Sequence, residues 1–161
     1  MLRMSRKLDY GLLVLSHLVG QGPTGASARD IAERFGISQA FVANVLKALA
    51  QSGLVRSFRG VHGGYTLARA PARITMLDVL GALEGPFAWA ECSQRPADSQ
   101  RDCELVAVCP VCEPIKNLHH RIEELLRSTT LADITGATVA GQNAHTLRAT
   151  PGKPSPDDPE G

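Results

Sequence analysis

The chain has 161 residues, a net charge of only +1 and 43% hydrophobic residues, which is enough for one compact core with an appended element. No apolar run approaches the roughly 20 residues needed to span a bilayer, and no small-residue cleavage motif follows the basic start, so a signal peptide is not expected. These features predict a cytoplasmic protein, where thiols stay reduced.

The charge is unevenly distributed along the chain. Residues 1–74 carry ten lysines and arginines against three acidic residues, a net charge of +7. Residues 75–161 carry seven against thirteen, a net charge of −6. This asymmetry predicts a polyanion-binding module followed by a separate acidic module, with chance clustering of solvated charges as the alternative.

Apolar residues at helical spacing predict three helices in the first 53 residues. The first ends near Gly20, and a loop containing Pro23 follows. A short second helix ends at Gly36, and a third runs to about Ser52 with Ser38 as its N-cap. Two helices joined by a tight turn containing glycine are typical of a helix-turn-helix, although such hairpins also occur in plain helical bundles.

The third helix would expose short side chains that reach base edges in a major groove, while its N-terminus would favour a phosphate. The residues that we expect to contact DNA from this helix are Ser38, Gln39, Ala40, Ala43, Asn44 and Lys47.

A β-hairpin is predicted directly after the third helix, with strands over 54–58 and 65–68 and the glycine-rich turn RGVHGG between them. A hairpin in this position is the wing of a winged helix. Arginines beside the tip suit a minor groove or phosphates, with solvated side chains as the alternative. The predicted wing contacts are Arg56, Arg59, Gly60, His62, Gly63, Gly64 and Tyr65.

The second half begins with a helix that Thr75 caps and Gly85-Pro86 ends. After a cysteine-rich segment, in which Phe87 and Trp89 are expected anchors, Pro114 opens a long helix. Its apolar stripe, Ile115, Leu118, Ile122, Leu125 and Leu126, predicts pairing with a second subunit or packing on the first helix of the same chain.

The sequence therefore predicts a mainly α fold with a small β-hairpin wing, in four parts. Residues 1–86 form a winged helix-turn-helix domain and residues 87–113 a cysteine-rich loop. Residues 114–135 form a dimerisation helix and a short capping helix. Residues 136–161 are expected to be disordered, because the last thirteen contain four prolines and three acids.

All four cysteines lie in one segment, as Cys92, Cys103, Cys109 and Cys112, with the spacing C-x10-C-x5-C-x2-C. Thiolates are soft donors, so the candidate occupants are an iron–sulfur cluster and zinc. A structural zinc site usually pairs two C-x2-C knuckles, and only one is present. A disulfide switch and unliganded thiols remain alternatives.

Histidine ligands and a catalytic role are two further explanations for this segment. His119 and His120 follow on the long helix and are expected at the surface or an interface rather than as ligands. No strand-turn-helix surrounds the cysteines as a nucleophile would require, so the chain is not predicted to be an enzyme.

Several stretches together carry a family resemblance over about residues 1–135. They are the opening MLRMSRKLDYGLLVL, DIAERFGIS followed by VLKALAQSGLV, RGVHGGYTLAR, ITMLDVLGALEG, and the C-x5-C-x2-C segment before a long helix. In these the chain resembles the IscR/NsrR-type winged-helix transcription regulators, and most closely their subgroup that regulates SUF-system Fe–S cluster assembly.

The resemblance implies a homodimer that binds a palindromic operator in double-stranded DNA and a 2Fe–2S or 4Fe–4S cluster. The family's three cysteine ligands correspond to Cys92, Cys103 and Cys109. The fourth ligand corresponds to Cys112, which we favour, or to Asp9, an acid of the first helix that would be donated across the dimer. The gap after Cys92 is longer than the family usually has, so the segment must bulge there.

The function that this resemblance implies is an Fe–S-sensing regulator, a repressor of Fe–S assembly genes. A redox or nitric-oxide sensor on the same scaffold is the first alternative. A zinc-stabilised interaction module without a role on DNA is the second.

Overall fold

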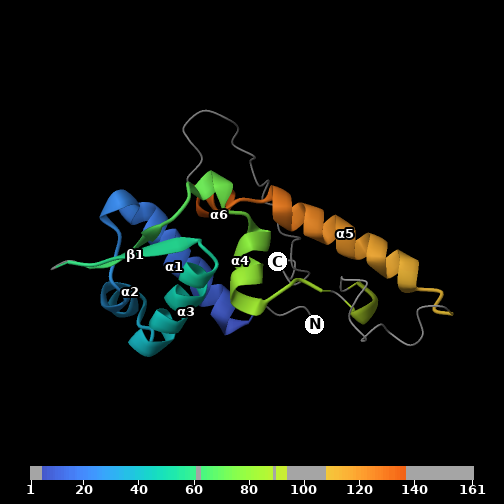
Figure 1. The fold of residues 1–161 in the computed structure, drawn as a ribbon, viewed down its shortest axis with the longest axis horizontal. Helices are drawn as coiled ribbons and strands as arrows, with labels where there is room; N and C mark the ends of the chain where they lie inside the picture. The colour runs from blue at the N-terminus through green and yellow to red at the C-terminus, as the bar shows by residue number, and fades with distance from the viewer. Residues whose placement is uncertain (1–4, 61–62, 89, 94–107, 137–161) are drawn as a thin grey trace, which may run out of the picture.

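The computed structural model describes residues 5–60, 63–88, 90–93 and 108–136 (Figure 1). Its fold is mainly α with one two-stranded antiparallel sheet, as the sequence predicts. The elements in order are α1 (Arg6–Gln21), η1 (Gly22–Thr24), α2 (Ala28–Phe35), α3 (Gln39–Gln51), β1 (Val55–Phe58), β2 (Gly64–Leu67), η2 (Pro71–Arg73), α4 (Met76–Glu84), η3 (Glu91–Ser93), α5 (Cys112–Ser128) and α6 (Leu131–Thr135). Among the helices described, none has the length and apolar character that a membrane span requires.

Local side-chain chemistry fixes the start of three helices. Ser27, Thr75 and Thr130 form capping boxes with the aspartate three residues further on, at the start of α2, α4 and α6. Ser38 occupies the N-cap position of α3, but its side chain makes no capping hydrogen bond. The prediction that Ser38 is the N-cap of α3 is therefore correct for its position and wrong for its capping hydrogen bond.

One apolar core joins α1 to α4, the hairpin and α6. Helix α1 packs on both α3 and α4, and α2 packs on α3 as the first helix of the helix-turn-helix. The side chains with essentially no exposed surface include Leu15, Leu18, Ile31, Leu46, Leu49, Leu54, Ile74, Val79 and Leu131. Because these come from α1, α2, α3, α4 and α6, and from the residues next to β1 and α4, the winged helix and α6 form one packed unit.

The wing is attached to the segment before α2 through an isolated β-bridge. Tyr65 in β2 exchanges two backbone hydrogen bonds with Ala26, of 2.9 and 3.0 Å, beside the paired strands β1 and β2. A Cβ at Gly64 would lie 2.8 Å from the Ala26 carbonyl oxygen. Gly64 is therefore glycine because β2 approaches the backbone of Ala26 closely, and it opens β2 rather than ending the turn.

The end of α5 is fastened to the start of α4 by backbone hydrogen bonds. The Met76 amide donates to the Thr129 carbonyl at 2.8 Å, and the Leu131 amide donates to the Ile74 carbonyl at 2.7 Å. Thr75 and Thr130 form a β-bridge between these two bonds. We call the bridge and the two bonds together the α4–α6 tie. From it α5 runs outward, away from α1 to α3 (Figure 1).

Helix α5 begins two residues before the predicted start at Pro114, which lies in its first turn. It packs against α4 and the turn η3. Its 17 residues span about 26 Å, whereas the nine of α4 span about 14 Å. The outer end of α5, with Cys112, therefore extends beyond α4. Residues 94–107 of the predicted cysteine loop and 137–161 of the predicted tail lie outside the described residues.

Two glycine substitutions test the close approach at Ala26. Gly64→Ala should lower the free energy of unfolding by about 1–3 kcal/mol, because the new methyl group collides with backbone that cannot rotate away. Gly20→Ala is the matched control, since Gly20 lies in the last turn of α1 with open space around it, and this variant should gain up to about 1 kcal/mol. Urea unfolding measures both, and equal stability of the two variants would contradict the proposed contact.

Candidate nucleic-acid interface and cysteine site

The helix-turn-helix presents the predicted face of α3 to solvent. The turn between α2 and α3 is closed by left-handed Gly36 and by a 3.0 Å hydrogen bond from the Ile37 amide to the Ala32 carbonyl. All six residues predicted to contact DNA from this segment are exposed, namely Ser38, Gln39, Ala40, Ala43, Asn44 and Lys47. The intervening Val42, Val45, Leu46 and Leu49 are buried in the core. Because Ser38 makes no capping bond, the first amides of α3 also remain open to an incoming acceptor.

The wing exposes both of its predicted arginine contacts but only one of the three predicted glycines. Arg56 and Arg59 are exposed, as is Gly60, and the Arg56 Nε donates to the Thr66 Oγ1 at 3.2 Å across the hairpin. Gly63 and Tyr65 are half-buried and Gly64 is buried, while His62 lies outside the described residues. The wing contacts stay a prediction, and the exposed side chains available for them are those of the two arginines.

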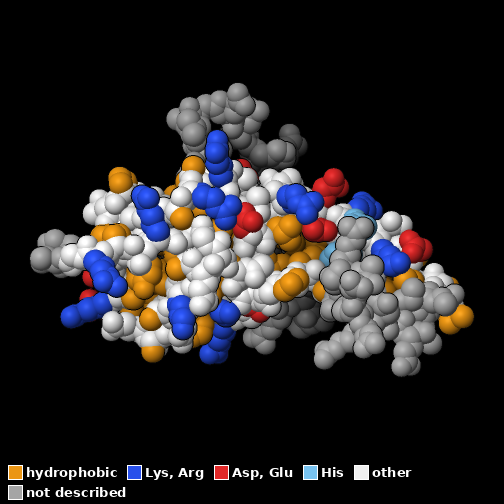
Figure 2. Space-filling view, in the orientation of Figure 1, with side chains coloured by type: hydrophobic (Ala, Val, Ile, Leu, Met, Phe, Trp, Pro, Cys, Tyr) orange, Lys and Arg blue, Asp and Glu red, His pale blue; other side chains and the backbone are white. Residues whose placement is uncertain are grey.

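Positively charged side chains are also distributed unequally between the winged-helix part and α5. On the face shown in Figure 2, lysines and arginines spread over the region of the hairpin and α1 to α3, and they are mixed with acids around α5. On α5 several of the acids are paired with bases, as in Glu113–Lys116 at 3.0 Å and Glu123–Arg127 at 2.7 Å. The net positive potential therefore belongs to the winged-helix part of the surface.

Cys109 and Cys112 stand at the two ends of a tight turn that leads into α5. The Cys112 amide donates to the Cys109 carbonyl at 3.4 Å, Pro110 occupies the second position, and Val111 has φ −100° and ψ −3°. These features define a type I turn. Cys112 is 3% exposed and begins the helix, whereas Cys109 is half-buried. The turn thus brings two thiols together at the positive end of α5.

Cys92 reaches the same helix from a different segment. It is half-buried in the turn η3, which packs against α5. Cys103 lies outside the described residues. Within the described ranges, no three Cys, His, Asp or Glu side chains converge closely enough to hold a metal ion. The structure therefore brings the segments of three predicted ligands to α5 without forming a closed site.

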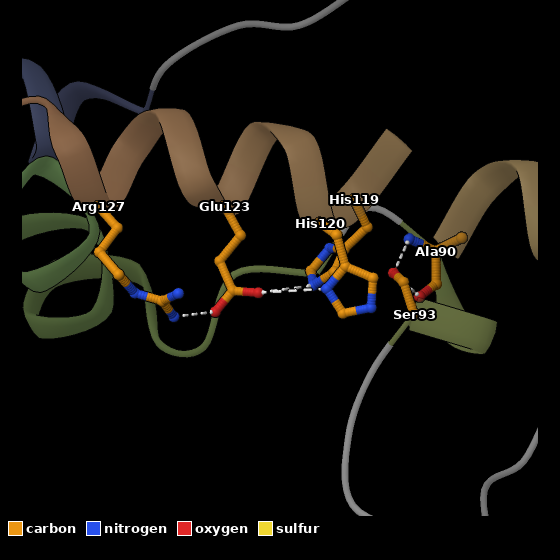
Figure 3. A network of polar contacts seen from close by, with 6 residues as sticks. All are labelled: Ala90, Ser93, His119, His120, Glu123 and Arg127. Atoms are coloured by element: carbon orange, nitrogen blue, oxygen red, sulfur yellow. Dashed lines mark hydrogen bonds and ion pairs between the residues drawn. The ribbon is translucent and has the colours of Figure 1, made fainter. Parts of the chain in front are cut away.

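His119 holds the segment before Cys92 against α5. Its ring stacks on Phe87 with centroids 5.0 Å apart and an interplanar angle of 8°, and only 7% of the residue is exposed. Its Nε2 lies 3.7 Å from Glu123 Oε2, which also lies 3.9 Å from His120 Nδ1 (Figure 3). His119, expected at the surface or an interface, is thus buried within its own chain, whereas His120 is exposed as expected.

The contact between Phe87 and His119 confirms one of the two predicted anchors, while Trp89 lies outside the described residues. A short turn follows, closed by the Ser93 Oγ, which accepts from the Ala90 amide at 2.9 Å and donates to the Ala90 carbonyl at 2.7 Å (Figure 3). His119 follows Cys112 by seven residues, a spacing that places both on one face of α5.

Lys116 lies one helical turn after Cys112. The pKa of its ammonium group is raised, first by its 3.0 Å hydrogen bond to Glu113 and then by the attraction of the Cys112 sulfur. A cation therefore accompanies the thiol at the start of α5.

Asp9 lies on the side of α1 that faces away from α4. The Lys7 ammonium donates to the Leu83 carbonyl, and Gly11 packs on the Leu83 side chain, so these two residues mark the α4 side. At about 100° per residue, Asp9 is about 200° round the helix from Lys7. Asp9 is exposed there, and it does not point to the segment that follows α4 in its own chain.

An exposed recognition helix beside an arginine-bearing wing defines the class of winged-helix DNA-binding regulators. Residues 4–137 match the family model Rrf2, described as iron-dependent transcriptional regulator, and the chain belongs to this family. It is thus a DNA-binding transcription regulator of a family that is not enzymatic.

Relatives of this kind cover most of the chain. The HTH-type transcriptional regulator CymR of Bacillus subtilis strain 168 is 31% identical over 147 residues, which is 89% of this chain and 97% of that protein. A putative HTH-type regulator of Synechocystis, slr0846, is 33% identical over 83% of this chain and 87% of its own.

Solved structures agree with these relatives. CymR, the global cysteine regulator of B. subtilis, has a TM-score of 0.64 and 32% identity, covering 86% of this chain and all of its own. T. potens IscR has a TM-score of 0.62 and 32% identity, covering 90% and 94%. The IscR-type resemblance is confirmed at the level of the family, which does not single out the SUF subgroup.

Replacing the two neighbouring histidines tests the anchor on α5. His119→Ala should lower the free energy of unfolding by about 1–2 kcal/mol and speed hydrogen exchange of the Ala90 and Ser93 amides, because the stacked ring is lost. His120→Ala, whose ring is 63% exposed, should change neither quantity. Exchange at η3 that is unchanged in His119→Ala would show that Phe87 does not hold the turn.

Proposed function

We propose that the chain senses the state of an iron–sulfur cluster and represses genes of Fe–S cluster assembly. The ligands in this proposal are Cys92, Cys103, Cys109 and Cys112. The observation that carries it is the C-x2-C turn at the start of α5, with the turn of Cys92 packed on the same helix. The description of the family as iron-dependent supports the choice of metal.

The donor set suits such a group chemically. The described candidates are three thiols, and soft thiolates favour iron–sulfur clusters and zinc over hard cations. When bound, a cluster would supply iron–thiolate bonds and a centre that responds to oxidants and to iron supply. The chain's own part is to present two sulfurs from the turn at α5 and a third from η3, with the Phe87–His119 stack fixing η3 on the helix.

The second element of the proposal is a homodimer formed through α5. In the chain as described, Leu125 is 64% exposed and Leu118 39% exposed. The other three residues of the stripe, Ile115, Ile122 and Leu126, are half-buried. A helix that leaves this much apolar side chain uncovered is suited to pairing with the same helix of a second copy.

A dimer of this kind would link the cysteine end to the DNA. The α4–α6 tie fastens α5 to α4, and α4 packs on α1 and α3. The position of each α5 in a dimer therefore bears on the separation of the two α3 helices. Two states that differ in this separation would differ in affinity for a palindromic operator.

The similarity to CymR favours a second candidate function. Its title names a global cysteine regulator, and its chain is covered completely by this one. On that candidate the chain would be a regulator connected with cysteine, and its activity would not require iron. The two candidates differ in whether the purified chain holds iron.

Anaerobic purification is the experiment that separates these candidates. The chain should be coloured, with thiolate-to-iron charge-transfer bands and matching contents of iron and acid-labile sulfide. Its binding to promoter DNA should change when the cluster is removed, and it should weaken steeply with salt. A colourless chain that contains stoichiometric zinc, or no metal, would overturn the Fe–S proposal.

The fourth ligand is tested by two variants of the same chain. Cys112→Ala should alter the visible spectrum and speed cluster loss, because a thiolate is removed from the iron, whereas Asp9→Ala should leave the spectrum unchanged. Spectra of the reconstituted variants under nitrogen provide the measurement. The opposite pattern would assign Asp9, and two unchanged spectra would contradict both assignments.

The dimer is tested on adjacent residues of α5. Leu125→Gln should weaken dimerisation at least tenfold, because it places an amide in the apolar seam. Glu124→Gln is the matched control, since Glu124 is exposed beside the stripe and should leave the mass unchanged. Both sites are exposed in a single chain, so folding should be retained. Sedimentation at several concentrations measures the masses, and a Leu125→Gln chain that stays dimeric would exclude this seam.

A further inference from the structure

The turn from Cys109 to Cys112 has the geometry of a chain reversal, which places its two end residues close together. The ends of such a turn have Cα atoms less than about 7 Å apart. Disulfides join residues with Cα atoms about 4.4–6.8 Å apart. The backbone bond from Cys112 to Cys109, at 3.4 Å, already holds the turn closed. Bridging the two sulfurs therefore needs side-chain rotation and little movement of the backbone.

The two thiols differ in their access to solvent. Cys109 is half-buried, and its neighbours Val108 and Val111 are 77% and 57% exposed. Cys112 is 3% exposed, inside the first turn of α5. A small oxidant in solution would therefore reach Cys109 first, with Cys112 next to it as a shielded second thiol.

From this geometry we propose that Cys109 and Cys112 form a redox-active dithiol, which hydrogen peroxide converts to an intramolecular disulfide when no metal is bound. The Cys109 sulfur attacks one peroxide oxygen, so that an S–O bond forms, the O–O bond breaks and the other oxygen leaves as water. The Cys112 sulfur then attacks the Cys109 sulfur, forming the S–S bond and releasing the hydroxyl as a second water. The two sulfurs lose two electrons, and the peroxide accepts them.

The position of the other described cysteine supports this pairing. Cys92 lies on η3, a separate segment that the Phe87–His119 stack holds on α5. Joining Cys92 to either thiol would link two segments whose relative position is already fixed by that stack. Joining Cys109 to Cys112 closes a ring of four residues within one turn.

The disulfide has a consequence that rests on the proposed function. It would remove two of the four proposed cluster ligands, so the oxidised chain could not accept a cluster until a reductant restored the thiols. The regulator would then stay in its oxidised, cluster-free form after exposure to an oxidant, until the disulfide was reduced. The disulfide itself does not depend on the identity of the metal.

The test uses the full-length chain, reduced and freed of metal with a chelator, and treated with one equivalent of hydrogen peroxide. Alkylation of the remaining thiols should show a loss of two of the four, reversed by a phosphine reductant. Trypsin releases residues 102–116, which also contain Cys103, so cleavage after Glu104 is needed to separate Cys103 from the other two. The bridge should lie within 105–116, and a bridge to Cys92 or Cys103, or four intact thiols, would overturn the proposal.

Two variants sharpen this test. The double variant Cys92→Ser with Cys103→Ser should form the same bridge at the rate of the wild-type chain. Cys112→Ser should stop at the sulfenic acid of Cys109, which a 1,3-diketone reagent traps. Circular dichroism measures whether each variant keeps its helix content and is therefore folded. If a variant does not fold, the position of the disulfide in peptides of the wild-type chain decides the pairing. A failure to reconstitute a cluster leaves this thiol count unaffected, so the two proposals fail separately.

Discussion

The architecture depends on the pair of backbone hydrogen bonds that join the start of α4 to the start of α6. The bonds from Met76 to Thr129 and from Leu131 to Ile74 involve no side chain that could change its charge or oxidation state. They place Leu131 in the core of the winged helix, so the C-terminal end of α5 is held in a fixed position. The cysteine turn at the other end of α5 is positioned through this helix, and η3 packs against it.

The two ends of α5 are therefore held by different kinds of interaction. The inner end is fixed by main-chain bonds and buried apolar side chains, which respond little to metal or oxidant. The outer end is held by the Phe87–His119 stack and by packing around Cys112, and it carries thiols that change with both. This separation leaves the DNA-binding part intact when the cysteine end changes its chemistry, which is suited to a regulator that must fold in every state.

Much of the DNA-binding half could be predicted from the sequence, because its signals are local. Helical spacing predicts the inward face of α3. Thr75 predicts the start of α4, because it forms a capping box with Asp78 three residues further on. The contacts that the sequence did not predict join distant segments, as Gly64 with Ala26 and Thr75 with Thr130. The burial of His119 is of the same kind, since it depends on a phenylalanine 32 positions earlier in the chain. The missing Ser38 bond shows that residue preference at an N-cap does not fix side-chain orientation.

The overhang of α5 has a mechanical consequence. A force applied at Cys112 acts on the α4–α6 tie through an arm of about 26 Å, and a displacement of about 1 Å at the outer end corresponds to a rotation of about 2° at the tie. A small contraction among the cysteine segments would therefore act as a torque on α4, which packs on α1 where the Leu83 side chain lies against Gly11. The length of α5 would in this way convert a small displacement at the cysteine turn into a rotation at the α4–α6 tie.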